Sequence, residues 1–250
     1  MAKILLTGST GFIGKYLLKL LETEQHDIST WEKNRDGNFN DSRIREKVLT
    51  KYKPQIVVHL AWPSLQKSEY TKDETHISFA RETCDFLNTC TSKGARFISL
   101  GTVFERSTLD DANKYGIGKK LISDLISSNP DLDATWLVPS YIFSFEEEKP
   151  RLLGEISRIS QPISTILKNP NLIQNWIEVR DVALALNFAI NSNLRGVYNI
   201  ESRANVTVKD FAEHFVKYQE KNSDFQVRSR ELFLEKNTLF VESFTRLYLE

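Results

Sequence analysis

Cysteine and histidine are scarce in this chain, and neither has the spacing of a metal site. The 250 residues include two cysteines and four histidines. Cys84 and Cys90 fall in one predicted helix without metal-ligand spacing, and no two histidines have the spacing that binds zinc from a helix. We therefore expect no metal ion and two reduced thiols.

Net charge is also absent, because 33 lysines and arginines balance 33 aspartates and glutamates. A chain without excess positive charge has no electrostatic basis for binding nucleic acid or a membrane surface. Long apolar runs are missing too, since none approaches the roughly 20 residues of a membrane span. The first expected strand begins at residue 3 and leaves no room for a signal peptide, so we expect a cytoplasmic protein.

The composition that remains is ordinary for a globular protein, 40% hydrophobic and 26% charged. Short apolar segments alternate with helical ones over the first 140 residues, which predicts an α/β fold with a doubly wound parallel sheet. The expected strands are residues 3–7, 27–32, 37–39, 55–60, 95–100 and 133–138. The expected helices are residues 12–24, 42–52, 71–93 and 113–128.

The alternation loosens after residue 140. Residues 179–190 predict a helix and 197–200 a strand that returns to the sheet, while Thr207 is typical of the cap of a further helix. The segment after about residue 222 fits strand or helix. We expect a domain of residues 1–140, to which 176–200 return, and a small C-terminal lobe of residues 141–175 and 201–250.

A glycine-rich loop follows the first expected strand. The apolar run Ile4-Leu5-Leu6 leads into Gly8, Gly11 and Gly14, and apolar residues then recur at helical spacing. Strand, glycine turn and helix in this order are the context of a dinucleotide-binding loop. The glycines allow a tight turn, a close approach of backbone amides to a diphosphate, and tight packing of helix on strand. The diphosphate would lie at the helix N-terminus, which favours anions.

An acidic residue closes the second expected strand. The carboxylate of Glu32 is placed to bind the adenosine ribose hydroxyls and to repel a 2′-phosphate, which favours NAD. Lys33 and Arg35 follow at once and would attract that phosphate instead, or belong to a solvated turn. The sequence therefore favours NAD over NADP only slightly.

Tyr115 and Lys119 are four residues apart on an expected helix and so share one face. A free tyrosine has a pKa of roughly 10, and a neighbouring cation lowers it. This pair is suited to acid–base chemistry at neutral pH. A chance pair on a solvated helix face is the alternative, and the upstream glycine loop argues against it.

From residue 3 to about 217 the chain resembles an extended short-chain dehydrogenase/reductase of the NAD-dependent epimerase/dehydratase family. The resemblance rests on the order of several segments that are modest one by one. They are residues 7–14 (TGSTGFIG), 37–41 (GNFND), 54–61 (PQIVVHLA), 97–102 (FISLGT), 115–119 (YGIGK), 176–183 (WIEVRDVA) and 196–200 (GVYNI). The fold implied is a Rossmann fold with a small C-terminal substrate-binding lobe.

The resemblance also implies contacts to the dinucleotide. The glycines of the loop would hold the diphosphate, Asn38 with Phe39 would lie against the adenine, and Leu60 with Ala61 would line the cofactor cleft. Lys119 would hold the nicotinamide ribose and tune Tyr115, and Pro139 with Ser140 would flank the nicotinamide. The complete implied set is Gly8, Thr10, Gly11, Phe12, Ile13, Gly14, Glu32, Lys33, Asn38, Phe39, Leu60, Ala61, Trp62, Tyr115, Lys119, Pro139 and Ser140.

The family has a third catalytic residue, a Ser or Thr after the fifth strand. One alignment of Val103-Phe104 places Leu100 there, which cannot donate a hydrogen bond. Another, on a Gly-(Ser/Thr)-x-x-Glu pattern, places Thr102 there, and we favour Thr102 because the chemistry needs a donor. Dehydratases of the family carry an acidic pair directly after this residue, whereas Val103 and Phe104 cannot act as acid or base.

The implied activity is NAD(P)-dependent reduction of a nucleotide-linked 4-keto-6-deoxysugar, with Thr102, Tyr115 and Lys119 as catalytic residues. One alternative is a nucleotide-sugar 4-epimerase with tightly bound NAD, and another is a non-catalytic dinucleotide sensor or scaffold. The family often dimerises through the two helices at 71–93 and 113–128, so a homodimer is expected. Phe79, Phe86 and Leu87 fit that interface or burial against the chain's own sheet.

Overall fold

The computed structural model describes residues 1–64, 70–106, 113–144, 169–202, 205–213 and 232–241. The chain divides into two compact units. The first comprises residues 1–139 and 183–199, and the second comprises residues 140–182 and 200–250.

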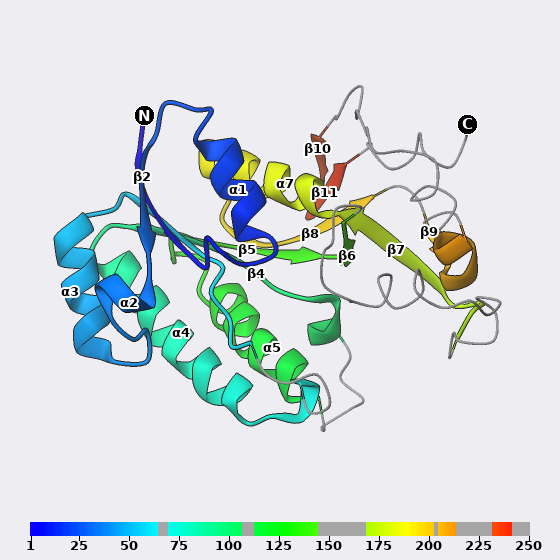
Figure 1. Ribbon diagram of the computed structural model, residues 1–250, viewed down its shortest axis with the longest axis horizontal. Coiled ribbons are helices and arrows are strands. Elements are labelled where there is room, and N and C mark those ends of the chain that lie inside the picture. The colour runs from blue at the N-terminus through cyan, green and yellow to red at the C-terminus, as the bar shows by residue number, and fades with distance from the viewer. Residues whose placement is uncertain (65–69, 107–112, 145–168, 203–204, 214–231, 242–250) are drawn as a thin grey trace. The chain divides into compact units, whose positions relative to one another are not determined.

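A parallel sheet forms the centre of the first unit (Figure 1). Its strands lie in the order β8-β5-β4-β3-β1-β2, and β1 to β5 pair in parallel. The apolar runs of β1, β3 and β4 are buried throughout or nearly so, as in strands covered on both faces. The doubly wound parallel sheet is thus confirmed. The strand bounds are β1 (Lys3–Thr7), β2 (Asp27–Trp31), β3 (Ile56–His59), β4 (Arg96–Leu100), β5 (Ala134–Pro139) and β8 (Gly196–Ser202).

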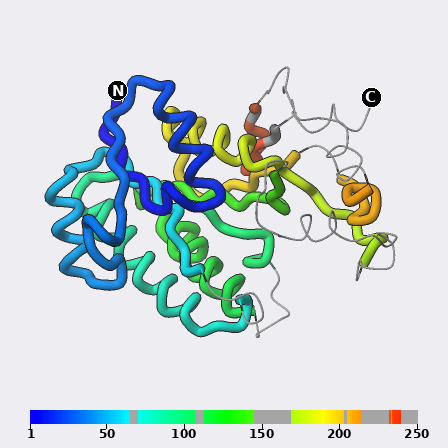
Figure 2. Tube along the Cα trace, viewed as in Figure 1, coloured from blue at the N-terminus to red at the C-terminus, as the bar shows by residue number. Residues whose placement is uncertain are grey.

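Helices cover both faces of this sheet (Figure 1). On one face α4 and α5 pack against each other, with α3 beside α4, and on the other lies α1 (Figure 2). The Asp41 side chain caps α3 by accepting from Arg43 N, and Asn113 caps α5 by accepting from Gly116 N at 3.0 Å. The bounds are α1 (Gly14–Leu21), α2 (Lys33–Asp36), α3 (Ser42–Tyr52), α4 (Thr75–Ser92), α5 (Lys114–Ser127) and α7 (Val179–Asn191), with 3₁₀ turns η1 (Tyr70–Lys72) and η2 (Val103–Arg106).

The strand expected at residues 37–39 is wrong. The short helix α2 precedes it, and the carboxylate of Asp36 accepts from Glu32 N and turns the chain back. Gly37 then has a φ of 99°, outside the range of a strand, and its carbonyl accepts from Trp31 Nε1 at 3.1 Å. The segment is therefore held by turn and side-chain hydrogen bonds rather than by a neighbouring strand.

His59 lies at the end of β3 in an aromatic cluster. It is 2% exposed, its Nδ1 hydrogen-bonds Thr7 Oγ1 at 2.8 Å, and the ring of Phe39 stacks on it at 4.7 Å. Burial, with smaller contributions from the charges of Lys119 and Arg45, lowers the pKa of His59 to about 3. The imidazole is therefore neutral at pH 7 and joins β1 to β3 within the core.

Phe86 and Leu87 are fully buried in α4, and Phe79 is 8% exposed. These side chains are covered within the first unit, so they are core residues and do not provide a dimer interface. A homodimer through α4 and α5 stays a prediction that must use other side chains, such as Leu121 of α5, which is 39% exposed.

The second unit contains a small sheet in which β7 (Ile173–Glu178) pairs in parallel with β6 (Tyr141–Phe143) and antiparallel with β9 (Asn205–Thr207). Thr207 caps helical residues 208–213, as expected, because its Oγ1 accepts from Asp210 N at 3.0 Å. The chain end left open as strand or helix forms an antiparallel hairpin of β10 (Leu232–Glu235) and β11 (Thr238–Val241).

Most of the expected substrate lobe lies outside the described residues, namely residues 145–168, 203–204, 214–231 and 242–250, and its role stays a prediction. Among the residues that are described, no helix combines the length and hydropathy needed to cross a membrane.

Candidate active site

The glycine loop joins β1 to α1 and lies against the end of β3. Gly8 has a φ of 73°, and a Cβ built on it would stand 2.6 Å from Ala61 N and 2.7 Å from the carbonyl carbon of Leu60. Only glycine combines that backbone angle with so close an approach. Thr7 ties the same two segments together, because its Oγ1 accepts from Ala61 N at 3.2 Å. The loop and the residues after β3 therefore form one surface.

The start of α1 suits an anion. Ile13 stands at the N-cap position, and its side chain cannot accept a hydrogen bond from the N–H groups of the first helical turn. Gly11 N donates to Gly8 O at 3.0 Å and closes the turn before the helix. This is the arrangement in which a helix N-terminus binds a phosphate group.

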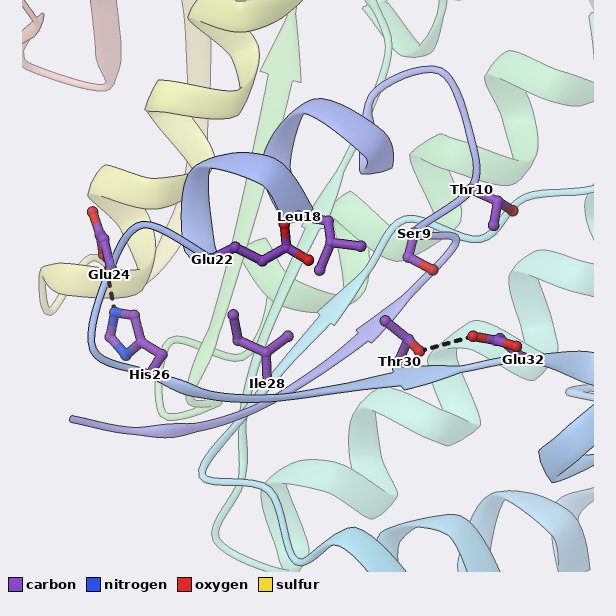
Figure 3. A pocket seen from close by; sticks show the side chains of 9 residues that line it. All are labelled: Ser9, Thr10, Leu18, Glu22, Glu24, His26, Ile28, Thr30 and Glu32. Atoms are coloured by element: carbon purple, nitrogen blue, oxygen red, sulfur yellow. Dashed lines mark hydrogen bonds and ion pairs between the residues drawn. The ribbon is translucent and has the colours of Figure 1, made fainter.

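A cavity of about 280 Å³ adjoins the loop, lined by Gly8, Ser9, Thr10 and residues 31–34. Glu32 stands at the end of β2, where its carboxylate accepts from Thr30 Oγ1 at 3.1 Å (Figure 3). The same carboxylate lies 3.5 Å from the guanidinium of Arg35. A larger hollow along α1 and β2 shares Ser9, Thr10 and Glu32. A carboxylate beside a glycine loop fits the adenosine ribose of a dinucleotide, as the sequence suggested.

Lys119 is a deeply buried charged group on α5. It is 7% exposed, its Nζ donates to the carbonyl of Leu100 at 2.8 Å, and the ring of Trp62 lies 3.7 Å from the same atom. Burial lowers its pKa to about 7, against the opposing attraction of Glu105. The ammonium is therefore poised to gain or lose its proton near neutral pH.

Thr102 follows β4 and is fixed by Glu105 on η2. The Glu105 carboxylate accepts from Thr102 N at 3.0 Å and from Trp136 Nε1 at 3.1 Å. Burial raises the pKa of Glu105, although these hydrogen bonds oppose the rise. Thr102 Oγ1 accepts from Phe104 N at 3.4 Å, an arrangement that leaves the hydroxyl proton to be donated.

Tyr115 lies one helical turn before Lys119 and is surrounded by other aromatic rings. Its ring centroid is 5.2 Å from those of Tyr70 and His76, and 6.0 Å from that of Trp62. The ring of Phe104, two residues after Thr102, lies 6.4 Å away. The structure thus brings the Tyr115–Lys119 pair and the Thr102 loop together in the first unit.

A sequence model of the NAD-dependent epimerase/dehydratase family matches residues 4–200. The chain belongs to this family. It is accordingly an NAD(P)-dependent enzyme of the extended short-chain dehydrogenase/reductase type, and the resemblance inferred from the sequence is confirmed.

Several known proteins are similar to this family member. A dTDP-6-deoxy-L-talose 4-dehydrogenase (NAD(+)) of Aggregatibacter actinomycetemcomitans is 23% identical, covering 90% of this chain and 96% of its own. The structure of dTDP-4-dehydrorhamnose reductase from Bacillus anthracis with NADP has a TM-score of 0.69 at 17% identity, covering 98% and 85% of the two chains. UDP-glucose 4-epimerase from Thermotoga maritima with UDP-glucose has a TM-score of 0.67 at 16% identity, covering 88% and 84%.

The remaining expected cofactor residues of this epimerase-family enzyme are spread more widely. Asn38 is exposed after α2, whereas the ring of Phe39 packs within the aromatic cluster around His59. Pro139 ends β5, and Ser140 begins the second unit, where its N and Oγ both donate to Ile200 O. Their contacts to a dinucleotide stay predictions.

The sequence analysis did not identify three residues that lie near Tyr115 or Lys119. Glu105 had a local signal, the Gly-Thr-Val-Phe-Glu pattern, but that pattern does not reveal the carboxylate's bond to Thr102 N. Tyr70 and His76 had none, because they approach Tyr115 from η1 and α4 rather than through a motif. Among the described residues, no group of three or more His, Cys, Asp and Glu is arranged to hold a metal ion.

Replacing Lys119 with methionine should flatten the pH dependence of stability. The folded pKa is about 7, whereas an unfolded lysine titrates near 10.4. Between these values the unfolded chain binds more protons, so this side chain makes the free energy of unfolding rise with pH by up to about 1.4 kcal/mol per unit. Lys119→Met should lose that slope and be relatively more stable at pH 7 and below. Urea denaturation from pH 6 to 10 measures it.

Lys120→Met is the matched control, since Lys120 is exposed and pairs with Asp124 at 2.6 Å. It should keep the wild-type slope. An unchanged slope in Lys119→Met would show that the lysine is not buried with a lowered pKa.

Proposed function

We propose that this enzyme catalyses the NAD(P)-dependent reduction of a nucleotide-linked 4-keto-6-deoxysugar. The observation that carries the proposal is the position of the buried Lys119 ammonium. Lys119 lies one helical turn from Tyr115, and its Nζ donates to the carbonyl of Leu100, the residue two positions before Thr102. Two similar proteins, dTDP-6-deoxy-L-talose 4-dehydrogenase and dTDP-4-dehydrorhamnose reductase, have names that describe redox chemistry at position 4 of a dTDP-linked sugar, which supports this substrate class.

The three catalytic residues have distinct roles in the proposal. Tyr115 donates a proton to the oxygen at C4 of the sugar as the carbonyl becomes an alcohol. Lys119, when protonated, stabilises the phenolate that this leaves. Thr102 donates a hydrogen bond to the same sugar oxygen and stabilises the negative charge that develops on it. The nicotinamide supplies the hydride when it is bound.

The first unit provides residues that fit the cofactor. Gly8, Gly11 and Gly14 with the start of α1 would hold the diphosphate, and Glu32 the adenosine ribose hydroxyls. The residues Leu60, Ala61 and Trp62, which follow β3 beside the loop, would line the cleft. NAD is slightly favoured over NADP because the Glu32 carboxylate lines the cavity beside the loop.

Dehydration is disfavoured by the loop after Thr102. Val103 and Phe104 occupy the positions of the family's acidic pair, and Phe104 lies near Tyr115. The nearby carboxylate of Glu105 is 7% exposed and engaged with Thr102 N and Trp136. It is placed to shape the loop rather than to remove a proton from a sugar.

The substrate class is tested by supplying dTDP-, UDP-, CDP- and GDP-linked 4-keto-6-deoxysugars with NADH or NADPH. The proposal expects oxidation of the reduced nicotinamide with at least one of them, followed by its absorbance. A 4-epimerase would instead purify with bound NAD and interconvert sugar nucleotides without added reductant. Cofactor binding with no turnover on the panel would contradict the proposal.

Replacing Glu32 with glutamine should shift cofactor preference towards NADP(H). The change removes the negative charge that repels a 2′-phosphate while Lys33 and Arg35 remain nearby. We expect the ratio of kcat/KM for NADPH to that for NADH to rise about tenfold, equivalent to about 1.4 kcal/mol. Glu22→Gln, on the neighbouring hollow, should leave the ratio unchanged. An equal ratio in Glu32→Gln and wild type would place the adenosine ribose elsewhere.

A further inference from the structure

His76 is a fully buried histidine that the catalytic scheme above does not use. It is the second residue of α4, and both of its ring nitrogens are engaged. Nδ1 lies 2.9 Å from the Nε1 of Trp62, and Nε2 is bonded to the carbonyl oxygen of Tyr70. An indole N–H can only donate, so Nδ1 must be the acceptor and Nε2 must carry the proton. The imidazole is therefore held neutral in one tautomer.

The partner of that hydrogen bond is the ring that covers Lys119. Trp62 lies 3.7 Å from the Lys119 ammonium by its centroid, and its plane is nearly parallel to that of His76, at 14°. Trp62 follows β3 outside any helix or strand, so its backbone alone does not fix the ring. The indole packs against the rings of Phe79, at 5.2 Å, and Tyr115, at 6.0 Å, and the bond to His76 fixes the direction of its N–H.

The two helices that carry these residues meet without an intervening side chain. Gly118 lies on α5 between Tyr115 and Lys119, and a Cβ there would stand 2.7 Å from the carbonyl oxygen of His76. This close approach sets the imidazole against the Tyr115 ring, 5.2 Å between centroids. His76 thus contacts Tyr115 directly and reaches Lys119 through Trp62.

We propose that His76 is a positioning residue for the catalytic pair: by accepting the Trp62 N–H it holds the indole against the Lys119 ammonium and confines the Tyr115 ring. The proposal rests on the proposed function for its kinetic consequence. A cation against an indole face is stabilised, which offsets part of the cost of burying the Lys119 charge. Loss of the anchor therefore disturbs both members of the pair.

The same hydrogen bond makes the arrangement sensitive to acid. Protonation of His76 turns Nδ1 into a donor and breaks its bond to Trp62. Burial lowers the pKa of His76 below its ordinary 6.5, opposed by its bond to Tyr70 and by Asp73, while the charge of Lys119 lowers it further. Among the described residues, Tyr70 and Tyr115 face His76, Glu105 attracts Lys119, and Glu74 at the start of α4 pairs with Lys114 of α5 at 3.1 Å. We expect the anchor to be intact at pH 7 and lost well below pH 6.5.

Glutamine and phenylalanine at position 76 separate hydrogen bonding from packing. In His76→Gln the amide oxygen can accept from Trp62 and the amide nitrogen can donate to Tyr70, and neither titrates. His76→Phe fills the space without either bond. We expect kcat to fall about tenfold to a hundredfold in His76→Phe, with KM and NAD(P)H affinity changed little, and to stay near wild type in His76→Gln. In a Trp62→Phe background, His76→Phe should have little further effect.

The pH profile gives a readout that a merely structural role would not change. The loss of kcat in wild type as pH falls through the His76 pKa should be absent in His76→Gln, which retains Glu105 and Lys119. Wild-type kcat and pH profile in His76→Phe would overturn the proposal. So would equal losses of kcat in His76→Gln and His76→Phe when circular dichroism shows both variants folded.

Tryptophan fluorescence tests the anchor without any substrate. Subtracting the emission of Trp62→Phe from that of wild type isolates the emission of Trp62. This emission should change with pH below 6.5 in the wild-type background. It should not change in the His76→Gln background, where Trp62→Phe is again the protein subtracted. An absence of this transition in wild type would refute the anchor, whatever the activity. Its presence, together with no turnover on the sugar panel, would refute the proposed function and leave the Trp62–His76 arrangement standing.

Discussion

Tyr115→Phe should reduce turnover of the proposed 4-keto-sugar substrate by about a hundredfold to ten-thousandfold, the usual range for removal of a general acid. The substitution deletes only the phenol oxygen and keeps the ring among Tyr70, His76 and Trp62. Binding of NAD(P)H should therefore be largely unaffected. Steady-state kinetics and a fluorescence titration of the cofactor measure the two effects separately.

Tyr198→Phe is the matched control. Tyr198 lies on β8, and its hydroxyl donates to Arg195 O at 3.0 Å. Loss of this hydroxyl should leave kcat within about twofold of wild type, since surface changes usually cost within about 0.5 kcal/mol. Full activity in Tyr115→Phe would remove Tyr115 as the proton donor. Equal losses in both variants would point to a general sensitivity to hydroxyl deletion instead.

Gly8→Ala should both destabilise the fold and weaken cofactor binding. A left-handed φ costs an alanine about 1–2 kcal/mol, and crowding of a packed site adds typically about 1–3 kcal/mol. Here the crowded atoms are backbone atoms of Leu60 and Ala61, which have no side-chain freedom with which to move away. We expect at least about a tenfold loss of NAD(P)H affinity, because the loop and the residues after β3 must separate.

Gly94→Ala isolates the backbone part of this effect. Gly94 has nearly the same φ, 75°, but a Cβ there would meet no atom within 4 Å. It should lose only the roughly 1–2 kcal/mol of the left-handed conformation and bind NAD(P)H normally. Thermal unfolding and cofactor titration of the two variants provide the comparison. Equal stability and equal affinity in both would show that the Gly8 approach is not a cofactor-binding constraint.

Features encoded locally were predictable from the sequence. The strands β1 and β4 were expected because they are short apolar runs, and α3 was expected because helical segments alternate with such runs. The strand expected at 37–39 failed for a reason that lies outside those residues. The conformation of this segment is set by the turn in which the Asp36 carboxylate accepts from Glu32 N, and by the hydrogen bond from Trp31 Nε1 to Gly37 O.

The candidate site likewise has features that the local sequence predicts and features that depend on tertiary contacts. The four-residue spacing of Tyr115 and Lys119 places them on one helix face in any helical context. The lowered pKa of Lys119 depends instead on burial, with Trp62 and Leu100 O against its ammonium, and these residues lie far apart in the sequence. No local pattern states that His76 would bond Trp62 or that Glu105 would hold Thr102 N.

The sequence by itself determined the family, the doubly wound sheet and the residue types and spacing of the proposed Tyr115–Lys119 pair. These depend on the order of short motifs, on periodicity and on residue type, all of which are fixed within a few neighbouring positions. The tertiary structure alone decided how deeply Lys119 is buried, which rings surround Tyr115 and which side chains fix Thr102. Burial and hydrogen bonding between distant segments arise only once the strands pair and the helices pack, and these are the interactions that set the proton affinities of the site.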